Sequence, residues 1–163
     1  MGVGKSTVGI MLAKKLKLEF VDVDKVIEKN EKSTIREIFK KKGENYFRII
    51  EKKKTLDLLK KSDLVIALGG GSFVNTTIRK IVKKTAMSFW LDLKLSVLLT
   101  RLKNVKKRPL LTHNNLEKTV NKIYSERKKF YSESDFRINC DLLDTNQIIN
   151  RIIKLYENTG NKN

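Results

Sequence analysis

A chain of 163 residues suits one domain with its own hydrophobic core, and it contains no run approaching the ~18 apolar residues of a membrane-spanning helix. The net charge of +18 suggests nucleic-acid binding, yet 28 of the 36 cations are lysines in small scattered clusters, which is typical of solvated helix faces, so we expect no nucleic-acid partner. A single cysteine, Cys140, excludes an internal disulfide and indicates a cytoplasmic location.

The spacing of apolar residues predicts helices and strands that largely alternate along the chain. In order, we expect a helix over 7–16, a strand over 18–24, helices over 25–30, 35–42 and 44–61, a strand over 63–68, a helix over 77–84, a strand over 87–92, helices over 95–102 and 116–131, a strand over 136–140 and a helix over 145–156. Ser33 and Glu37 suggest a capping box, and Gly43 a helix end. This order predicts an α/β fold with a central parallel sheet flanked by helices.

The first residues match the second half of a phosphate-binding loop, G-x-x-x-x-G-K-S/T. The residues concerned are Gly2, Val3, Gly4, Lys5, Ser6 and Thr7. Glycines allow backbone N–H groups to surround phosphate oxygens, and the following helix dipole favours anions. The motif's first glycine and the strand that feeds it would precede Met1. We therefore expect Met1 to be an internal methionine, with the natural start about ten residues upstream.

Two further groups fall near the carboxyl ends of predicted strands, where parallel sheets bind ligands. Asp22 and Asp24 are two apart on a predicted strand, so both side chains should leave one face and could serve a metal and a hydroxyl, although helix-capping acids are the alternative. The triple glycine 69–71 after an apolar strand suggests close approach of the backbone to a ligand. Arg48 and Glu51 can pair on one helix, as an ordinary surface ion pair also would.

Taken together and in this order, these motifs resemble the shikimate kinase family of phosphate-loop kinases over nearly the whole chain. The matching stretches are GKST, the Asp22–Asp24 pair, Glu37-Ile38-Phe39, Gly43-Glu44 with Phe47-Arg48 and Glu51, the triple glycine, Trp90-Leu91-Asp92, Arg108-Pro109-Leu110-Leu111, and Arg127 with Tyr131. The resemblance implies a single three-layer P-loop kinase domain over 1–163, whose first, central strand is absent from this chain. It also implies a substrate-binding segment at about 24–60 and a lid at about 103–115.

The same resemblance implies that ATP phosphorylates the 3-hydroxyl of shikimate with Mg²⁺ as cofactor, in a monomeric enzyme of aromatic amino acid biosynthesis. Residue by residue it implies phosphate binding by residues 2–7 with Lys5 catalytic, Mg²⁺ binding by Ser6 and Asp22, hydrogen bonding of the attacking hydroxyl by Asp24, and adenine contact by Arg101. It further implies that Arg48 and Arg127 hold the shikimate carboxylate, that Gly69, Gly70 and Gly71 line the pocket, and that Arg108 closes over the phosphates.

Two alternatives remain open from the sequence. A related phosphate-loop kinase of another small hydroxy acid, such as gluconate, would share the GKST stretch and the fold. A basic nucleotide-binding or nucleic-acid-binding module without catalytic activity would share the charge. Arg48, Arg127 and the triple glycine favour shikimate, because planar guanidinium groups bind carboxylates with two parallel hydrogen bonds.

Overall fold

The computed structural model describes residues 2–103 and 116–160. Its helices are α1 (Lys5–Leu16), α2 (Val23–Glu31), α3 (Ile35–Leu58), α4 (Thr76–Thr85), α5 (Leu95–Lys103), α6 (Leu116–Tyr131) and α7 (Thr145–Gly160), with a 3₁₀ turn η1 (Ser72–Val74). Its strands are β1 (Glu19–Asp22), β2 (Leu64–Ala67), β3 (Phe89–Asp92) and β4 (Phe136–Asn139). None of the helices in these two ranges has the length and apolar character needed to span a membrane.

The strands form two parallel pairs, as the alternation of elements predicts. β1 pairs with β2, so that Asp22 lies opposite Ala67, and β3 pairs with β4, so that Asp92 lies opposite Asn139. Within the described ranges no ladder joins the two pairs. The carboxyl ends of β1 and β2 lie at one edge, which brings Asp22 close to the triple glycine that follows β2.

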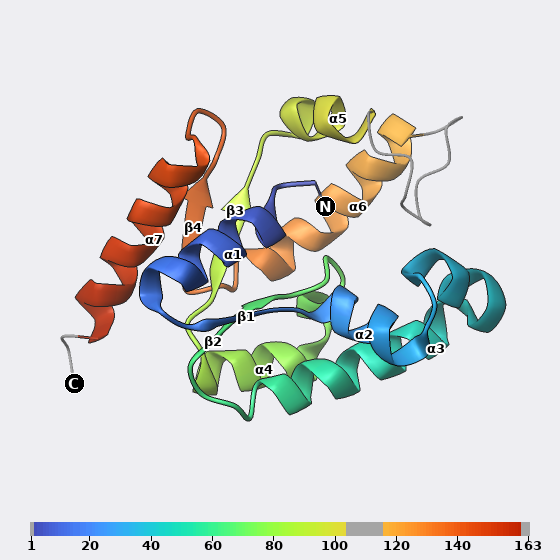
Figure 1. Ribbon diagram of the computed structural model, residues 1–163. Helices are drawn as coiled ribbons and strands as arrows, with labels where there is room; N and C mark the ends of the chain where they lie inside the picture. The colour runs from blue at the N-terminus through green and yellow to red at the C-terminus, as the bar shows by residue number, and fades with distance from the viewer. Residues whose placement is uncertain (1, 104–115, 161–163) are drawn as a thin grey trace.

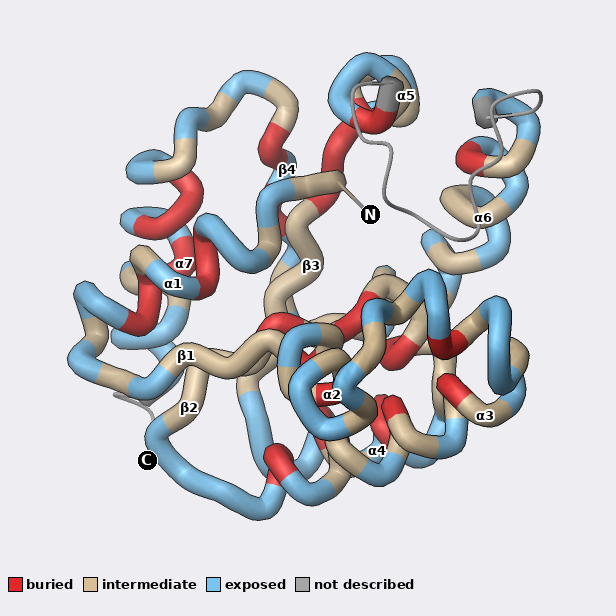
Figure 2. Tube along the Cα trace, turned by 45° about the vertical axis from the view of Figure 1, so that its right-hand side comes forward, coloured by how far each residue is buried: buried red, intermediate tan, exposed pale blue. Residues whose placement is uncertain are grey.

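Helices lie against each strand pair (Figure 1). Side chains from α1 and α7 pack with those of β3 and β4 in one cluster, while α2 and α3 pack against β1 and β2 in another. Smaller clusters join η1 to α4 and α5 to α6. Figure 2 shows that buried residues recur on the inward side of the helices, as expected of amphipathic helices around a core.

The expected break at Gly43 is present as a kink inside α3. Gly43 has φ 80° and ψ 168°, which only glycine adopts without strain, so the chain forms two helical segments that meet there. The capping box lies one residue later than predicted. Thr34 is the N-cap and exchanges hydrogen bonds with Glu37, whereas Ser33 does not cap, because the box places its acceptor three residues before the glutamate.

The prediction that Asp22 and Asp24 share one face of a strand is wrong. β1 ends at Asp22, and Asp24 lies in the first turn of α2. Asp22 causes the change, because its carboxylate accepts from the backbone N–H groups of Asp24 and Lys25 and so starts the helix. The alternative of a helix-capping acid therefore holds for Asp22.

Candidate functional site

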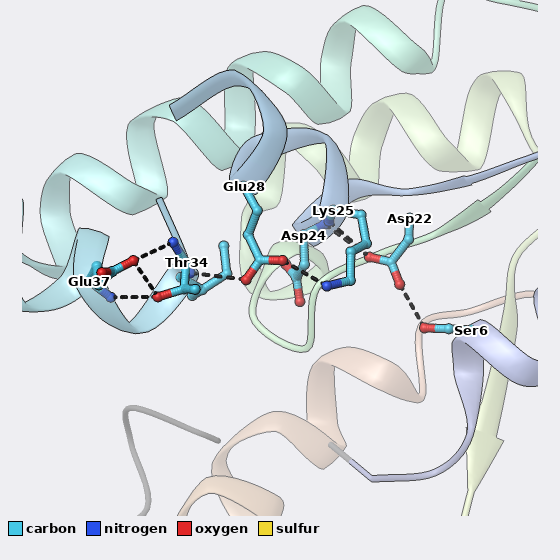
Figure 3. Close-up of polar contacts among 8 residues, drawn as sticks. Ser6, Asp22, Asp24, Lys25, Glu28, Thr34 and Glu37 are labelled. Carbon is cyan, nitrogen blue, oxygen red and sulfur yellow. Dashed lines mark hydrogen bonds and ion pairs between the residues drawn. The ribbon is translucent and has the colours of Figure 1, made fainter. Parts of the chain in front are cut away.

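The phosphate-loop residues form the entrance to α1. Gly4 is the N-cap, with φ 86° in the left-handed region, and Lys5 begins the helix as a half-buried residue. The Ser6 hydroxyl donates to Asp22 Oδ2 over 2.6 Å, which ties the start of α1 to the end of β1 (Figure 3). The phosphate loop thus lies beside Asp22, the acid at the end of β1.

Asp22 also fixes the position of Asp24. Its second oxygen, Oδ1, accepts from the backbone N–H of Asp24 over 3.0 Å, while Oδ2 accepts from Ser6 (Figure 3). The Asp22 carboxylate therefore connects the phosphate loop to the residue that the sequence predicts to contact the attacking hydroxyl. Its oxygen and that of Ser6 are of the kind that Mg²⁺ prefers.

The triple glycine lies directly against the predicted substrate-binding side chains. A Cβ atom at Gly69 would lie 2.8 Å from Asp24 Oδ1 and 2.4 Å from Glu51 Oε1. A Cβ atom at Gly71 would lie 2.4 Å from Arg48 Nη1. A larger residue at Gly69 or Gly71 would displace these side-chain atoms, so glycine at these two positions allows Asp24 and Arg48 to approach the backbone closely.

Arg48 is held by two glutamates of its own helix. Its Nη1 donates to Glu51 Oε2 over 2.7 Å, and its Nε and Nη2 both donate to Glu44 Oε1. Burial lowers the pKa of Arg48, but the hydrogen bonds and charges of Glu51 and then Glu44 more than offset this, so the pKa lies above its ordinary value. The i, i+3 pair expected from the sequence is thus confirmed, and it keeps the guanidinium charged and oriented.

Glu51 is buried and joins α3 to the glycine loop, which comprises residues 69–71 and is followed by Ser72. Its side chain is 3% exposed, and its Oε1 accepts from Ser72 Oγ over 2.7 Å. No local pattern in the sequence indicates a role for Ser72 beyond its place after the third glycine. Glu51 therefore fixes both Arg48 and the far end of the loop.

The second predicted arginine reaches the same loop from α6. Arg127 Nη1 donates to the Gly70 carbonyl over 2.8 Å, and the Tyr131 hydroxyl donates to the same oxygen. The structure thus brings Asp24, Arg48 and Arg127 to three consecutive glycines. The contact of Tyr131 was missed, although its spacing from Arg127 was part of the motif.

Two predicted residues are not placed at this cluster. Arg101 is an exposed residue of α5, and Arg108, with all but the first residue of the predicted lid, lies outside the described residues. Within the described ranges, no three histidine, cysteine or acidic side chains group together as a metal-binding cage. The arrangement that remains is an anion-binding loop beside two guanidinium groups and one carboxylate, which suits transfer of a phosphoryl group to a small acid.

Comparison with known proteins agrees with this geometry. The family model for shikimate kinase matches residues 1–157. The chain belongs to the shikimate kinase family. Among its relatives, the shikimate kinases of Sulfurihydrogenibium sp. (strain YO3AOP1) and Persephonella marina are 42% and 40% identical to it. Both alignments cover 94% of this chain, and they cover 91% and 92% of those two proteins respectively.

Solved structures of the shikimate kinase family share the fold described above. Shikimate kinase from Acinetobacter baumannii, in complex with shikimate, superposes with a TM-score of 0.92 at 32% identity, covering 99% of this chain and 90% of that one. The enzyme of Aquifex aeolicus superposes with a TM-score of 0.86 at 34% identity, covering 98% and 94%. The predicted α/β kinase fold is therefore confirmed.

Proposed function

We propose that this chain catalyses the reaction of its family, transferring the γ-phosphoryl group of ATP to the 3-hydroxyl of shikimate. The observation that carries the proposal is the convergence of Asp24, Arg48 and Arg127 on residues 69–71. Asp22 links this cluster to Ser6 at the phosphate loop. Nucleotide and acceptor sites must be adjacent for direct transfer, and Asp22 provides that adjacency.

The ATP site is proposed at the start of α1. The backbone N–H groups of residues 2–7 would surround the phosphates, with Lys5 as the cation nearest the transferring group. Arg101 and Arg108 are assigned to the adenine and the phosphates from the family resemblance. Lid closure by residues 103–115 would exclude water and so limit hydrolysis of ATP.

Magnesium is proposed to bind at Ser6 and Asp22. The Ser6 hydroxyl and the Asp22 carboxylate face each other at 2.6 Å, and hard oxygen ligands of this kind fit the ion. One or two protein oxygens suffice, because Mg²⁺ completes its shell with phosphate and water. When bound, the ion supplies positive charge that offsets the charge of the phosphates.

Shikimate is proposed to bind against the glycine loop. Arg48 and Arg127 would grip its carboxylate, and the backbone of residues 69–71 would line the pocket. Asp24 would accept the proton of the attacking hydroxyl, or align it, as the acceptor oxygen approaches phosphorus. Its carboxylate lies close to Gly69, within the proposed pocket.

A coupled assay of ADP release tests the function directly. We expect turnover with shikimate, MgATP and this chain, and at most weak turnover with gluconate. ADP release with gluconate but not with shikimate would reassign the substrate. Salt-sensitive binding of DNA or RNA without any ADP release would replace the proposal with a basic binding module.

The single domain, the monomeric state and the cytoplasmic location stay predictions. Cys140 is buried and free, and burial raises the pKa of its thiol to about 11, which keeps it unreactive. Light scattering of the purified chain tests the monomer, and a dimer mass would contradict it.

A further inference from the structure

Tyr131 and Arg127 share one acceptor at the centre of the proposed substrate site. They lie four residues apart on α6, so their side chains emerge on the same face of that helix. Both donate to the Gly70 carbonyl, which has two lone pairs and can accept from each. The two donors are nevertheless unequal, because only the guanidinium carries charge.

We propose that Tyr131 is a positioning residue, whose hydroxyl holds the glycine loop and thereby releases Arg127 to engage the substrate carboxylate. This inference rests on the proposed function. If Arg127 alone held Gly70, its movement toward a carboxylate would leave that carbonyl without a protein donor. Because a buried carbonyl without a donor costs free energy, the loop would then favour another backbone conformation. A second donor removes this conflict.

The orientation of one peptide group depends on this bond. The carbonyl of Gly70 and the N–H of Gly71 belong to the same planar trans peptide, so they point in opposite directions. With the carbonyl directed at α6, the N–H of Gly71 is directed away from α6. Tyr131 therefore sets the direction of a backbone donor in the loop that is proposed to line the pocket.

Residues on both sides of Gly70 are held by contacts with other parts of the chain, whereas the Gly70 carbonyl is held by Arg127 and Tyr131 of α6. Ser72 is bound to the buried Glu51, and its backbone N–H donates to the Gly69 carbonyl. These contacts fix the two ends of the turn but not the peptide between Gly70 and Gly71. The hydrogen bonds from Arg127 and Tyr131 to the Gly70 carbonyl hold this remaining peptide.

The surroundings of Tyr131 suit a permanent neutral donor. Burial raises the pKa of its hydroxyl above the ordinary value, the charges of Arg127 and Arg48 acting in the opposite direction. Its ring packs against Trp90 with centroids 6.0 Å apart and joins the cluster around Phe73. Substitution by phenylalanine would keep this packing and remove only the hydroxyl.

The test compares Tyr131→Phe with Tyr124→Phe. Tyr124 is a matched control, since it lies on the same helix but donates to Asp92 Oδ1 over 3.3 Å and not to the loop. For Tyr131→Phe we expect the Kd of shikimate, measured by calorimetry, and its KM to rise about three- to tenfold, the equivalent of one neutral hydrogen bond. The KM of ATP should stay unchanged. Tyr124→Phe should leave both shikimate constants unchanged.

Three results would overturn the inference. These are an unchanged shikimate Kd in Tyr131→Phe, an equal loss in Tyr124→Phe, or equal losses for shikimate and ATP, which would indicate general loosening. Failure of the proposed function is distinguishable, because the unsubstituted chain would then release no ADP with shikimate. If that chain turns over shikimate and Tyr131→Phe behaves like Tyr124→Phe, only the role of Tyr131 is lost.

Discussion

At the scale of single residues, Glu51 is the acid on which two parts of the site depend. Its buried carboxylate accepts from Arg48 on α3 and from Ser72 at the end of the glycine loop. Glu44 also binds Arg48, but its side chain is 49% exposed. The Arg48 guanidinium thus has one buried and one solvent-exposed partner, and we expect the two glutamates to contribute unequally to the stability of the fold.

Glu51→Gln should lower the free energy of unfolding by about 1–3 kcal/mol, because it leaves a partly buried guanidinium without its main counter-charge. Glu44→Gln is the matched control, and its effect should stay within about 0.5 kcal/mol, as for other exposed pairs. Urea denaturation of both variants measures the difference. Equal effects would show that burial of Glu51 does not determine its contribution.

Asp24→Asn should reduce kcat by about 10²–10⁴-fold, since an amide cannot accept the proton of the attacking hydroxyl. The fold should be preserved, because the N-cap of α2 is the neighbouring Asp22. Asp57→Asn, a change of the same kind at an exposed acid on α3, should leave kcat unaltered. A kcat for Asp24→Asn close to that of the control would remove Asp24 from the catalytic step.

Arg48→Lys should raise the KM for shikimate by at least about tenfold with a smaller effect on the KM for ATP, because an ammonium group cannot make two parallel bonds to a carboxylate. Arg151→Lys at an exposed position of α7 is the control. Steady-state kinetics with each substrate varied in turn separates the two constants. An unchanged KM for shikimate would contradict the carboxylate contact.

At the scale of elements, α3 depends on one glycine. Gly43→Ala should destabilise the protein by about 1–3 kcal/mol, because alanine is strained at φ 80° and ψ 168°. Steric overlap adds nothing, since the space around a Cβ atom there is open. Lys41→Ala, in the regular part of the helix, should change stability little. Similar urea midpoints for the two variants would show that the kink relaxes without cost.

Elements with strong local signals were predictable from the sequence, and those that depend on contacts across the fold were not. The bounds of α6 and the break at Gly43 follow from apolar spacing and from glycine chemistry. The helical position of Asp24 was missed, because capping by Asp22 overrides a short alternating pattern. The bond between Tyr131 and Gly70 joins residues 61 apart in sequence, and no local pattern encodes it.

In the candidate site too, some features could be predicted from the sequence and others depend on contacts across the fold. The residue types proposed to bind shikimate follow from the family resemblance, and the structure brings Asp24, Arg48 and Arg127 together at residues 69–71. What the sequence could not supply is how each is held in place. Glu51 was visible only as a helical neighbour of Arg48, whereas its buried bond to Ser72 depends on packing of α3 against the loop.

At the scale of the whole molecule, the charge of +18 should make stability depend on salt. Like charges repel in the folded state, and the Debye length shortens from ~30 Å at 0.01 M to ~8 Å at 0.15 M ionic strength. We therefore expect the thermal midpoint to rise as sodium chloride is added over this range at pH 7. A midpoint that falls with salt would indicate that attractive ion pairs outweigh the repulsion.

The central claim is that one site on this molecule holds ATP and shikimate close enough for direct transfer. The most direct measurement follows the radiolabelled γ-phosphoryl group of ATP after incubation with shikimate, Mg²⁺ and the chain. We predict that the label appears in shikimate 3-phosphate and that Asp24→Asn slows this transfer by about 10²–10⁴-fold. Label found only in inorganic phosphate, or remaining in ATP, would contradict it.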